Sequence, residues 1–133
     1  MARRHLAIFL RGTSEDILSA KKQVEIRLSQ SRVLPYEAII KDDEIYLKNS
    51  GGKIIGKVYV DNVLYYDKIT PEIFAKIKKQ YQEPAKMDED FWLRHRHSRY
   101  ISIIFLKNPR KFLTPVVYKK RDRRPWIILE EEK

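Results

Sequence analysis

The sequence contains no cysteine, which excludes a disulfide framework, a thiolate metal site and a cysteine nucleophile. It also has no apolar run near the roughly 18 residues that a membrane-spanning helix needs. The apolar stretch Leu6–Leu10 follows Arg3 and Arg4 but is interrupted at Arg11, so it is too short for a signal peptide. These absences predict a cytoplasmic protein that has no membrane partner.

The chain of 133 residues shows neither an internal repeat nor a linker between domains. Its hydrophobic share of 43% is typical of globular proteins and argues against disorder. We therefore expect residues 1–133 to form a single domain with a sizeable core. The abundance of Ile, Lys, Glu, Arg and Tyr favours a thermophilic source, whereas nothing in the sequence indicates an oligomeric state.

Acidic residues are almost absent from the last third of the chain. The segment 94–124 holds 11 Lys or Arg and one acid, Asp122, while the rest holds 17 basic and 17 acidic residues. Such concentrated positive charge indicates a polyanionic partner such as RNA, because each neutralised phosphate releases counterions. We predict that the nucleic-acid-binding residues are Arg94, Arg96, Arg99, Arg110, Lys111, Lys119, Lys120, Arg121, Arg123 and Arg124.

Seven apolar stretches predict a set of about six strands. They lie within residues 5–10, 21–32, 44–49, 53–66, 99–106, 112–118 and 126–129. Ser50, Gly51 and Gly52 form the turn of a hairpin, and Gly56 indicates a bulge or a tight bend. Asn108-Pro109 is expected to end the strand that begins at residue 99.

Helix-capping residues predict three helices between these strands. Thr13 opens a capping box and starts a short helix that runs to about Lys21. Thr70 caps a longer helix that ends at Pro84, and Asp88 caps a third, shorter one. The pattern predicts an α+β fold with a mostly antiparallel, barrel-like sheet.

Charged residues surround the second predicted strand, in the segment AKKQVEIR at residues 20–27. Glu25 and Arg27 share one face of the strand, and Lys22 stands at its junction with the preceding helix. We call Lys22, Glu25 and Arg27 the charged trio. The three side chains can converge on one small volume, where the glutamate stays ionised and the arginine offers a planar fork for a phosphate or a base edge. The alternative is that the charged trio only forms ion pairs that order the strand.

The same segment resembles the G-x-K-x-x-E-x-R signature of the ASCH domain superfamily, a branch of the PUA-like barrels. The charged trio matches this signature, and Ala20 replaces its glycine. The order of predicted elements is similar over essentially the whole chain, and the tail from Tyr100 resembles an uncharacterised, chiefly archaeal subgroup. The resemblance implies a PUA-like, mostly antiparallel β-barrel of about six strands with two or three short helices. It also implies that the charged trio faces a cleft that receives RNA or a modified nucleoside.

Some ASCH relatives are hydrolases, either ribonucleases or amidohydrolases that deacylate modified nucleosides. In such a reaction Lys22 and Glu25 would be the catalytic residues. The amidohydrolase type carries a hydroxyl nucleophile where this chain has Glu25, and a carboxylate can act as a general base but cannot replace that nucleophile. Thr13, Ser29 and Ser31 are nearby hydroxyl residues, but none stands at the matched position.

Two further motifs lie in the basic segment. His95-Arg96-His97 places two imidazoles at chelating spacing, but the chain has only one other histidine and no cysteine, and the neighbouring cations repel a metal ion. We predict no metal and no cofactor. Trp126 either packs into the core or offers a face on which an unpaired base stacks, and we favour the core.

The sequence therefore supports three hypotheses. The first is an RNA- or nucleotide-binding module that needs no catalysis and uses a PUA-like cleft plus a basic surface. The second is a nucleic-acid-processing hydrolase, a ribonuclease or a modified-nucleoside amidohydrolase, that uses the same cleft. The third is a protein-interaction domain for an acidic partner. We favour the first.

Overall fold

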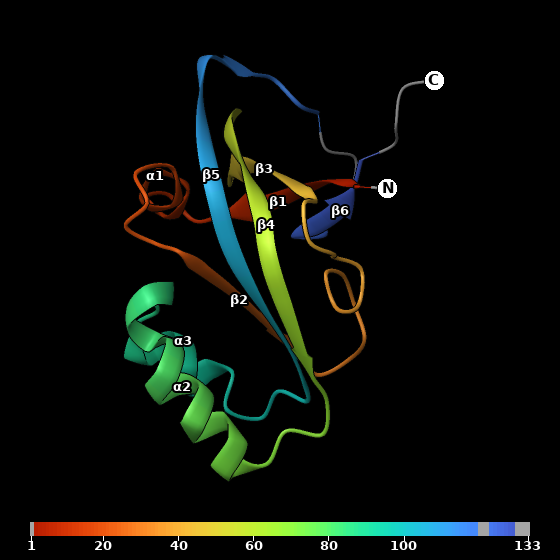
Figure 1. Cartoon of the computed structure of the whole chain (residues 1–133), viewed down its shortest axis with the longest axis vertical. Coiled ribbons are helices and arrows are strands. Elements are labelled where there is room, and N and C mark those ends of the chain that lie inside the picture. Colours follow the sequence, from red (N-terminus) through yellow and green to blue (C-terminus); the bar gives the residue numbers. More distant parts are fainter. Residues whose placement is uncertain (1, 120–122, 130–133) are drawn as a thin grey trace.

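The sheet of the computed structural model curls into a half barrel (Figure 1). The structure describes residues 2–119 and 123–129. Within them the strands are β1 (Arg4–Phe9), β2 (Val24–Ser29), β3 (Glu44–Asn49), β4 (Ile54–Tyr66), β5 (Tyr100–Val116) and β6 (Trp126–Ile128). Their order is β2-β5-β4-β3-β1-β6, with β1 and β3 parallel and all other neighbours antiparallel. The predicted α+β fold is confirmed, and β2 and β6 form the two edges of the sheet.

Three helices accompany the sheet in the described residues. They are α1 (Thr13–Leu18), α2 (Pro71–Ala85) and α3 (Glu89–Arg94). Helices α2 and α3 lie together beside β2 (Figure 1). The predicted caps of both are confirmed, because the side chains of Thr70 and Asp88 accept hydrogen bonds from the backbone N–H groups of Ile73 and Phe91. None of the described helices has the length and apolar character needed to cross a bilayer.

The boundaries of α1 differ from the prediction. Gly12, not Thr13, is the residue before the helix, and its backbone N–H donates to Glu15 Oε2 at 3.2 Å. The helix also ends before the predicted Lys21, because Ala20 takes a left-handed conformation with φ of 63°. A left-handed residue directly after a helix is a common way to stop it.

Helix α2 does not end at Pro84, as the sequence predicted, but includes it. A proline lacks the N–H that would bond to the preceding turn, so α2 loses one backbone hydrogen bond close to its C-terminal end. The helix then stops at Ala85, and Lys86 follows with a left-handed φ of 55°.

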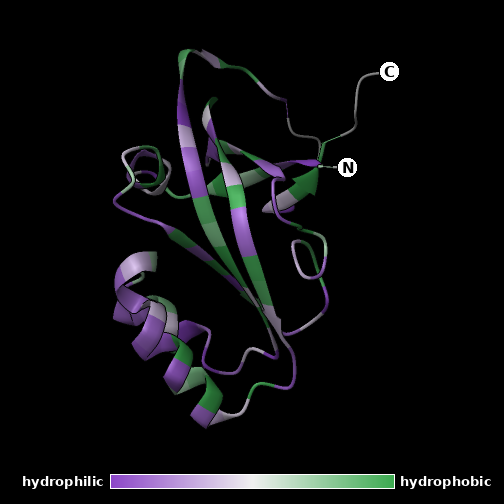
Figure 2. Ribbon diagram, viewed as in Figure 1, coloured by the Kyte–Doolittle hydropathy of each residue, from purple (hydrophilic) through white to green (hydrophobic). Residues whose placement is uncertain are grey.

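The sheet carries a hydrophobic core on each face. In β5, Ile101 and Ile103 pack in the core shared with α2 and α3, whereas Ile104 belongs to the core inside the half barrel. In β2, Val24 and Ile26 also face the helices. Figure 2 shows that β5 changes from an apolar half beside β2 to a mostly hydrophilic distal stretch. The alternation in β2 leaves its other face free for polar side chains.

Strand β5 is continuous through Asn108 and Pro109, where the sequence predicted a break. Asn108 has a left-handed φ of 52°, and the ladder between β4 and β5 shifts its register here. The two residues form an irregularity of the kind in which proline is accepted within a sheet. The predicted strands at 99–106 and 112–118 are therefore a single element.

Gly56 marks another register shift between β4 and β5, as the sequence predicted. A Cβ atom at this position would lie 2.6 Å from the carbonyl oxygen of Arg110 and 2.7 Å from a methyl carbon of Leu18. Glycine thus lets α1 pack directly on the strand.

Candidate functional site

The charged trio meets at one buried point. Glu25 Oε1 lies 3.0 Å from Lys22 Nζ, and Glu25 Oε2 accepts a hydrogen bond of 2.8 Å from Arg27 Nε. Lys22 and Glu25 are only 2% and 3% exposed, whereas the Arg27 side chain is 19% exposed. The carboxylate is therefore paired through both of its oxygens, and only the arginine reaches the surface.

The local fold brings these three side chains together. Val24 and Ile26 face the helices, which turns Glu25 and Arg27 to the inner face of the half barrel. Lys22 enters from the turn after α1, and its ammonium also donates to the carbonyl oxygen of Ala85 at the C-terminal end of α2. The partial negative charge of a helix C-terminus favours a cation there.

The left-handed backbone at Ala20 accounts for the glycine that the ASCH signature carries at this position. Its φ of 63° lies in the left-handed region, which an L-residue enters at a cost and glycine enters freely. The residue ends the turn that carries Lys22 into the trio. The departure from the signature therefore changes the strain of the backbone and leaves the trio intact.

Replacing Ala20 with glycine is expected to raise the free energy of unfolding by up to about 1 kcal/mol, because relief of the left-handed strain exceeds the added flexibility of the unfolded chain. Urea unfolding measures this change. The control is Ala75→Gly on the exposed side of α2, which should lower stability by about 1 kcal/mol through lost helix propensity. Equal losses from both substitutions would contradict the assignment of strain to residue 20.

The electrostatics of the trio favour an ionised glutamate. Burial alone would raise the pKa of Glu25, but the charges and hydrogen bonds of Lys22 and Arg27 outweigh it and hold the pKa below its usual value. The trio therefore has one negative and two positive charges at neutral pH. The excess positive charge lies toward Arg27, the most exposed member.

Arg27 joins the two edges of the half barrel. Its guanidinium carbon lies 5.0 Å from the ring centre of Phe9 and 5.1 Å from that of Trp126 on β6. Its Nη2 also donates to the carbonyl oxygen of Ile8 at 3.1 Å. The guanidinium is thus in cation–π contact with two aromatic rings and fixed by hydrogen bonds, an arrangement that lysine cannot reproduce.

Trp126 is also held by a buried row of hydrogen bonds that runs through His5 to Asp43. The indole Nε1 donates to His5 Nδ1 at 3.1 Å, and His5 Nε2 lies 2.8 Å from Asp43 Oδ2. All three residues are buried, which confirms that Trp126 packs in the core. Burial lowers the pKa of His5, so the neutral imidazole accepts from Trp126 at one nitrogen and donates to Asp43 at the other.

A cleft of about 340 Å³ opens beside the trio, which is within the usual size of small-ligand sites. Glu25 and Arg27 line it from β2, Phe91 and Arg94 line it from α3, and His95 lines it from the C-cap of that helix. The remaining lining residues are Ile8, Phe9, Leu10, Thr13, Ile26, Leu28, Met87 and Pro125. Lys22 lies behind Glu25 and does not line the cleft. The cleft thus combines one fixed guanidinium with aromatic and apolar walls.

The aromatic side of the cleft comes from two neighbouring residues of α3 and its cap. The rings of Phe91 and His95 lie 4.7 Å apart at 51°. Burial and then the charge of Arg94 lower the pKa of His95, so this imidazole is neutral at pH 7. Arg94 itself pairs with Asp90 at 2.8 Å.

The predicted basic residues are distributed over several places. Arg94 lines the cleft, and Arg123 lines a neighbouring hollow. Arg96 and Arg99 precede β5, Arg110 and Lys111 lie on its distal half, Lys119 follows it, Arg124 precedes β6, and Lys120 and Arg121 lie outside the described residues. At about 3.3 Å per residue, Arg96 and Arg99 are on the order of 30 Å from Arg110 and Lys111 along β5. The uninterrupted β5 therefore spreads this charge instead of gathering it at the cleft.

The described residues contain no group of three His, Cys, Asp or Glu side chains that could hold a metal ion. His95 and His97 have separate surroundings, since His95 is half-buried against Phe91 and His97 is exposed. Local patterns could not predict the roles of Phe9, Phe91 and His5, because each role depends on residues of another element.

Comparison with known protein families identifies the family of this chain. A model of the ASCH domain matches residues 13–116. The chain belongs to the ASCH domain family. Among solved structures, this ASCH domain is similar to the ASCH protein of Zymomonas mobilis, with a TM-score of 0.74 and 15% identity over 97% of this chain and 89% of that one. A point mutant of that protein gives a TM-score of 0.75 and 14% identity over 97% and 91%.

At these identities the likeness establishes the fold of this ASCH domain and nothing more specific. In sequence, the ASCH domain matches none of the curated proteins with which it was compared. Its ligand must therefore be argued from its own side chains.

Proposed function

We propose that this ASCH domain is an RNA- or nucleotide-binding module whose ligand enters the cleft beside the charged trio. The observation that carries the proposal is the guanidinium of Arg27. It is in cation–π contact with Phe9 and Trp126, is held by Glu25, and borders the cleft. A planar, fixed donor set of this kind suits a phosphate or the edge of a base.

The walls of the cleft support the same ligand class. Phe91 and His95 present half-buried aromatic rings on which an unpaired base can stack. Because Lys22 compensates the charge of Glu25, the positive charge of Arg27 remains for a phosphate group. ASCH and PUA-like domains generally bind nucleic acids, which agrees with this assignment. We further propose that residues 1–133 act as one domain in the cytoplasm.

The geometry supports binding more than hydrolysis. A general base must be free to accept a proton, whereas both oxygens of Glu25 are paired with cations and its pKa is lowered. Lys22 is buried behind the carboxylate and does not line the cleft. We therefore expect purified protein to leave single-stranded RNA and acylated nucleosides unchanged.

The binding proposal predicts that Arg27→Lys weakens binding of a short single-stranded RNA by about tenfold, because lysine keeps the charge but loses the stacked, forked donor. Fluorescence anisotropy at one fixed salt concentration measures the dissociation constant. The matched control is Lys79→Met, which removes an exposed cation of α2 away from the cleft and should change affinity little.

Polyglutamate serves as the competitor that separates RNA binding from recognition of an acidic protein. We expect it to displace RNA only weakly. If RNA binds the wild-type protein no tighter than polyglutamate does, the domain binds acidic polymers in general, and the proposal is wrong.

A further inference from the structure

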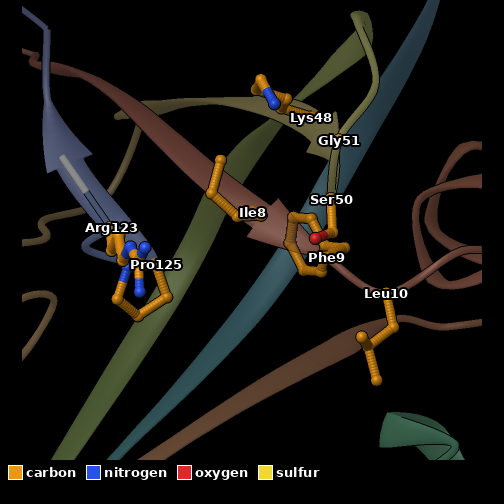
Figure 3. Close-up of a pocket in the computed structure, with 8 residues that line it drawn as sticks. All are labelled: Ile8, Phe9, Leu10, Lys48, Ser50, Gly51, Arg123 and Pro125. Atoms are coloured by element: carbon orange, nitrogen blue, oxygen red, sulfur yellow. The ribbon is translucent and has the colours of Figure 1, made fainter. Parts of the chain in front are cut away.

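A second hollow, of about 460 Å³, lies on the other side of the end of β1 (Figure 3). Lys48 and Ser50 border it from β3 and the following turn, and Arg123 and Pro125 border it from the segment before β6. The other lining residues are Ile8, Phe9, Leu10 and Gly51. We call it the Lys48 hollow.

Lys48 is a buried cation without a buried counter-charge. It is 8% exposed, and among the described residues its ammonium has one polar neighbour, the carbonyl oxygen of Asn49 at 3.4 Å. No described carboxylate forms an ion pair with it, in contrast to Lys22 and Lys57, which lie 3.0 and 2.6 Å from Glu25 and Glu44. Burying an ammonium without an anion costs free energy. An anion in the Lys48 hollow would remove this cost.

The remaining lining strengthens the preference for an anion. Arg123 supplies a second positive charge, Ser50 supplies a hydroxyl, and none of the acidic residues within 2–119 and 123–129 lines the hollow. Two cations and a hydroxyl around one space form a typical phosphate environment.

The Lys48 hollow and the cleft lie on either side of the end of β1 and share part of their lining. Both are lined by Ile8, Phe9, Leu10 and Pro125. The guanidinium of Arg27 stacks on Phe9 and bonds to the carbonyl oxygen of Ile8 within this shared wall. A ligand in the cleft therefore lies one strand away from the ammonium of Lys48.

We propose that Lys48 and Arg123 bind a phosphate group of the nucleic acid whose base lies in the cleft, so that the ligand is a single-stranded oligonucleotide of at least two nucleotides. This inference rests on the proposed function of the cleft. The cleft binds a base and the Lys48 hollow binds an adjoining phosphodiester, so the strand crosses the end of β1.

The test compares two dinucleotides of one sequence, one with a phosphodiester and one with a neutral methylphosphonate linkage, on wild-type protein and on Lys48→Met. We expect the wild-type protein to bind the phosphodiester about tenfold tighter, and Lys48→Met to lose most of this preference while Arg123 retains the remainder. Lys48→Met should also lower the salt dependence of phosphodiester binding, with a slope change of about 0.7 for one lost contact. Lys53→Met in the exposed hairpin turn is the control and should behave as wild type.

The binding measurement on Lys48→Met is not affected by a loss of folding. Methionine fills the volume of the lysine stem and removes the buried charge, so the melting temperature of Lys48→Met should equal or exceed that of the wild type. Inorganic phosphate should displace the dinucleotide only poorly. If it displaces it as well as a nucleoside 5′-monophosphate does, the hollow is a site for free phosphate, and the inference is overturned.

The two proposals fail in different ways. If Arg27→Lys weakens dinucleotide binding but Lys48→Met and Lys53→Met are alike, the cleft binds nucleic acid and the phosphate site is wrong. If wild-type protein binds neither dinucleotide, both proposals are wrong.

Discussion

Replacing Glu25 with glutamine lowers the free energy of unfolding by about 3–5 kcal/mol, the usual cost of leaving a buried charge without its partner. The reason is Lys22, whose ammonium is 2% exposed and lies 3.0 Å from the carboxylate. Glutamine preserves the shape of the side chain but not its charge. Urea denaturation followed by circular dichroism at pH 7 measures the change.

Two further variants separate the effect of the unpaired charge from effects of hydrogen bonding and packing. Glu83→Gln removes the carboxylate of an exposed pair with Lys86 and should leave stability unchanged within error. The double variant Lys22→Met/Glu25→Leu replaces the buried pair with apolar side chains and should recover most of the loss. If the double variant is as unstable as Glu25→Gln, hydrogen bonds and packing hold the trio together, and the explanation by unpaired charge is wrong.

Replacing Trp126 with phenylalanine lowers the free energy of unfolding by about 2–4 kcal/mol, because packing is lost and the buried Nδ1 of His5 loses its donor. The indole N–H donates to this nitrogen at 3.1 Å, and its ring also stacks on Arg27. The same variant should therefore weaken RNA binding. Thermal and urea unfolding measure the first effect and fluorescence anisotropy the second.

Trp92 provides a matched control for this substitution. It is equally buried, at 1% exposure, but its Nε1 has no hydrogen-bond partner among the described residues. Trp92→Phe removes the same atoms without leaving an acceptor unsatisfied, so its cost should be clearly smaller. Equal costs for the two substitutions would show that the link to His5 contributes nothing to stability.

Local patterns were sufficient to predict the elements around the trio. The alternation of Val24, Glu25, Ile26 and Arg27 identified a strand with one apolar and one charged face, and the structure shows both faces as expected. The caps at Thr70 and Asp88 were also predictable, because a capping hydrogen bond joins residues only three positions apart.

Features that depend on distant partners could not be predicted. The bond between Trp126 and His5 joins residues 121 positions apart, and no local pattern encodes it. Asn108-Pro109 has the composition of a strand end, yet pairing with β4 carries the strand past it. Nothing in the sequence predicted a role for Lys48, because the residues that border the hollow with it, on β1 and before β6, are distant in the chain.

The two edges of the sheet, β2 and β6, are not joined by a ladder of backbone hydrogen bonds. The side chain of Arg27 on β2 bridges them instead, through its contacts with Ile8 and Trp126. Because residue 27 bridges the two edges through its side chain alone, we expect its substitution to alter the entrance of the cleft while every strand pairing of the sheet survives.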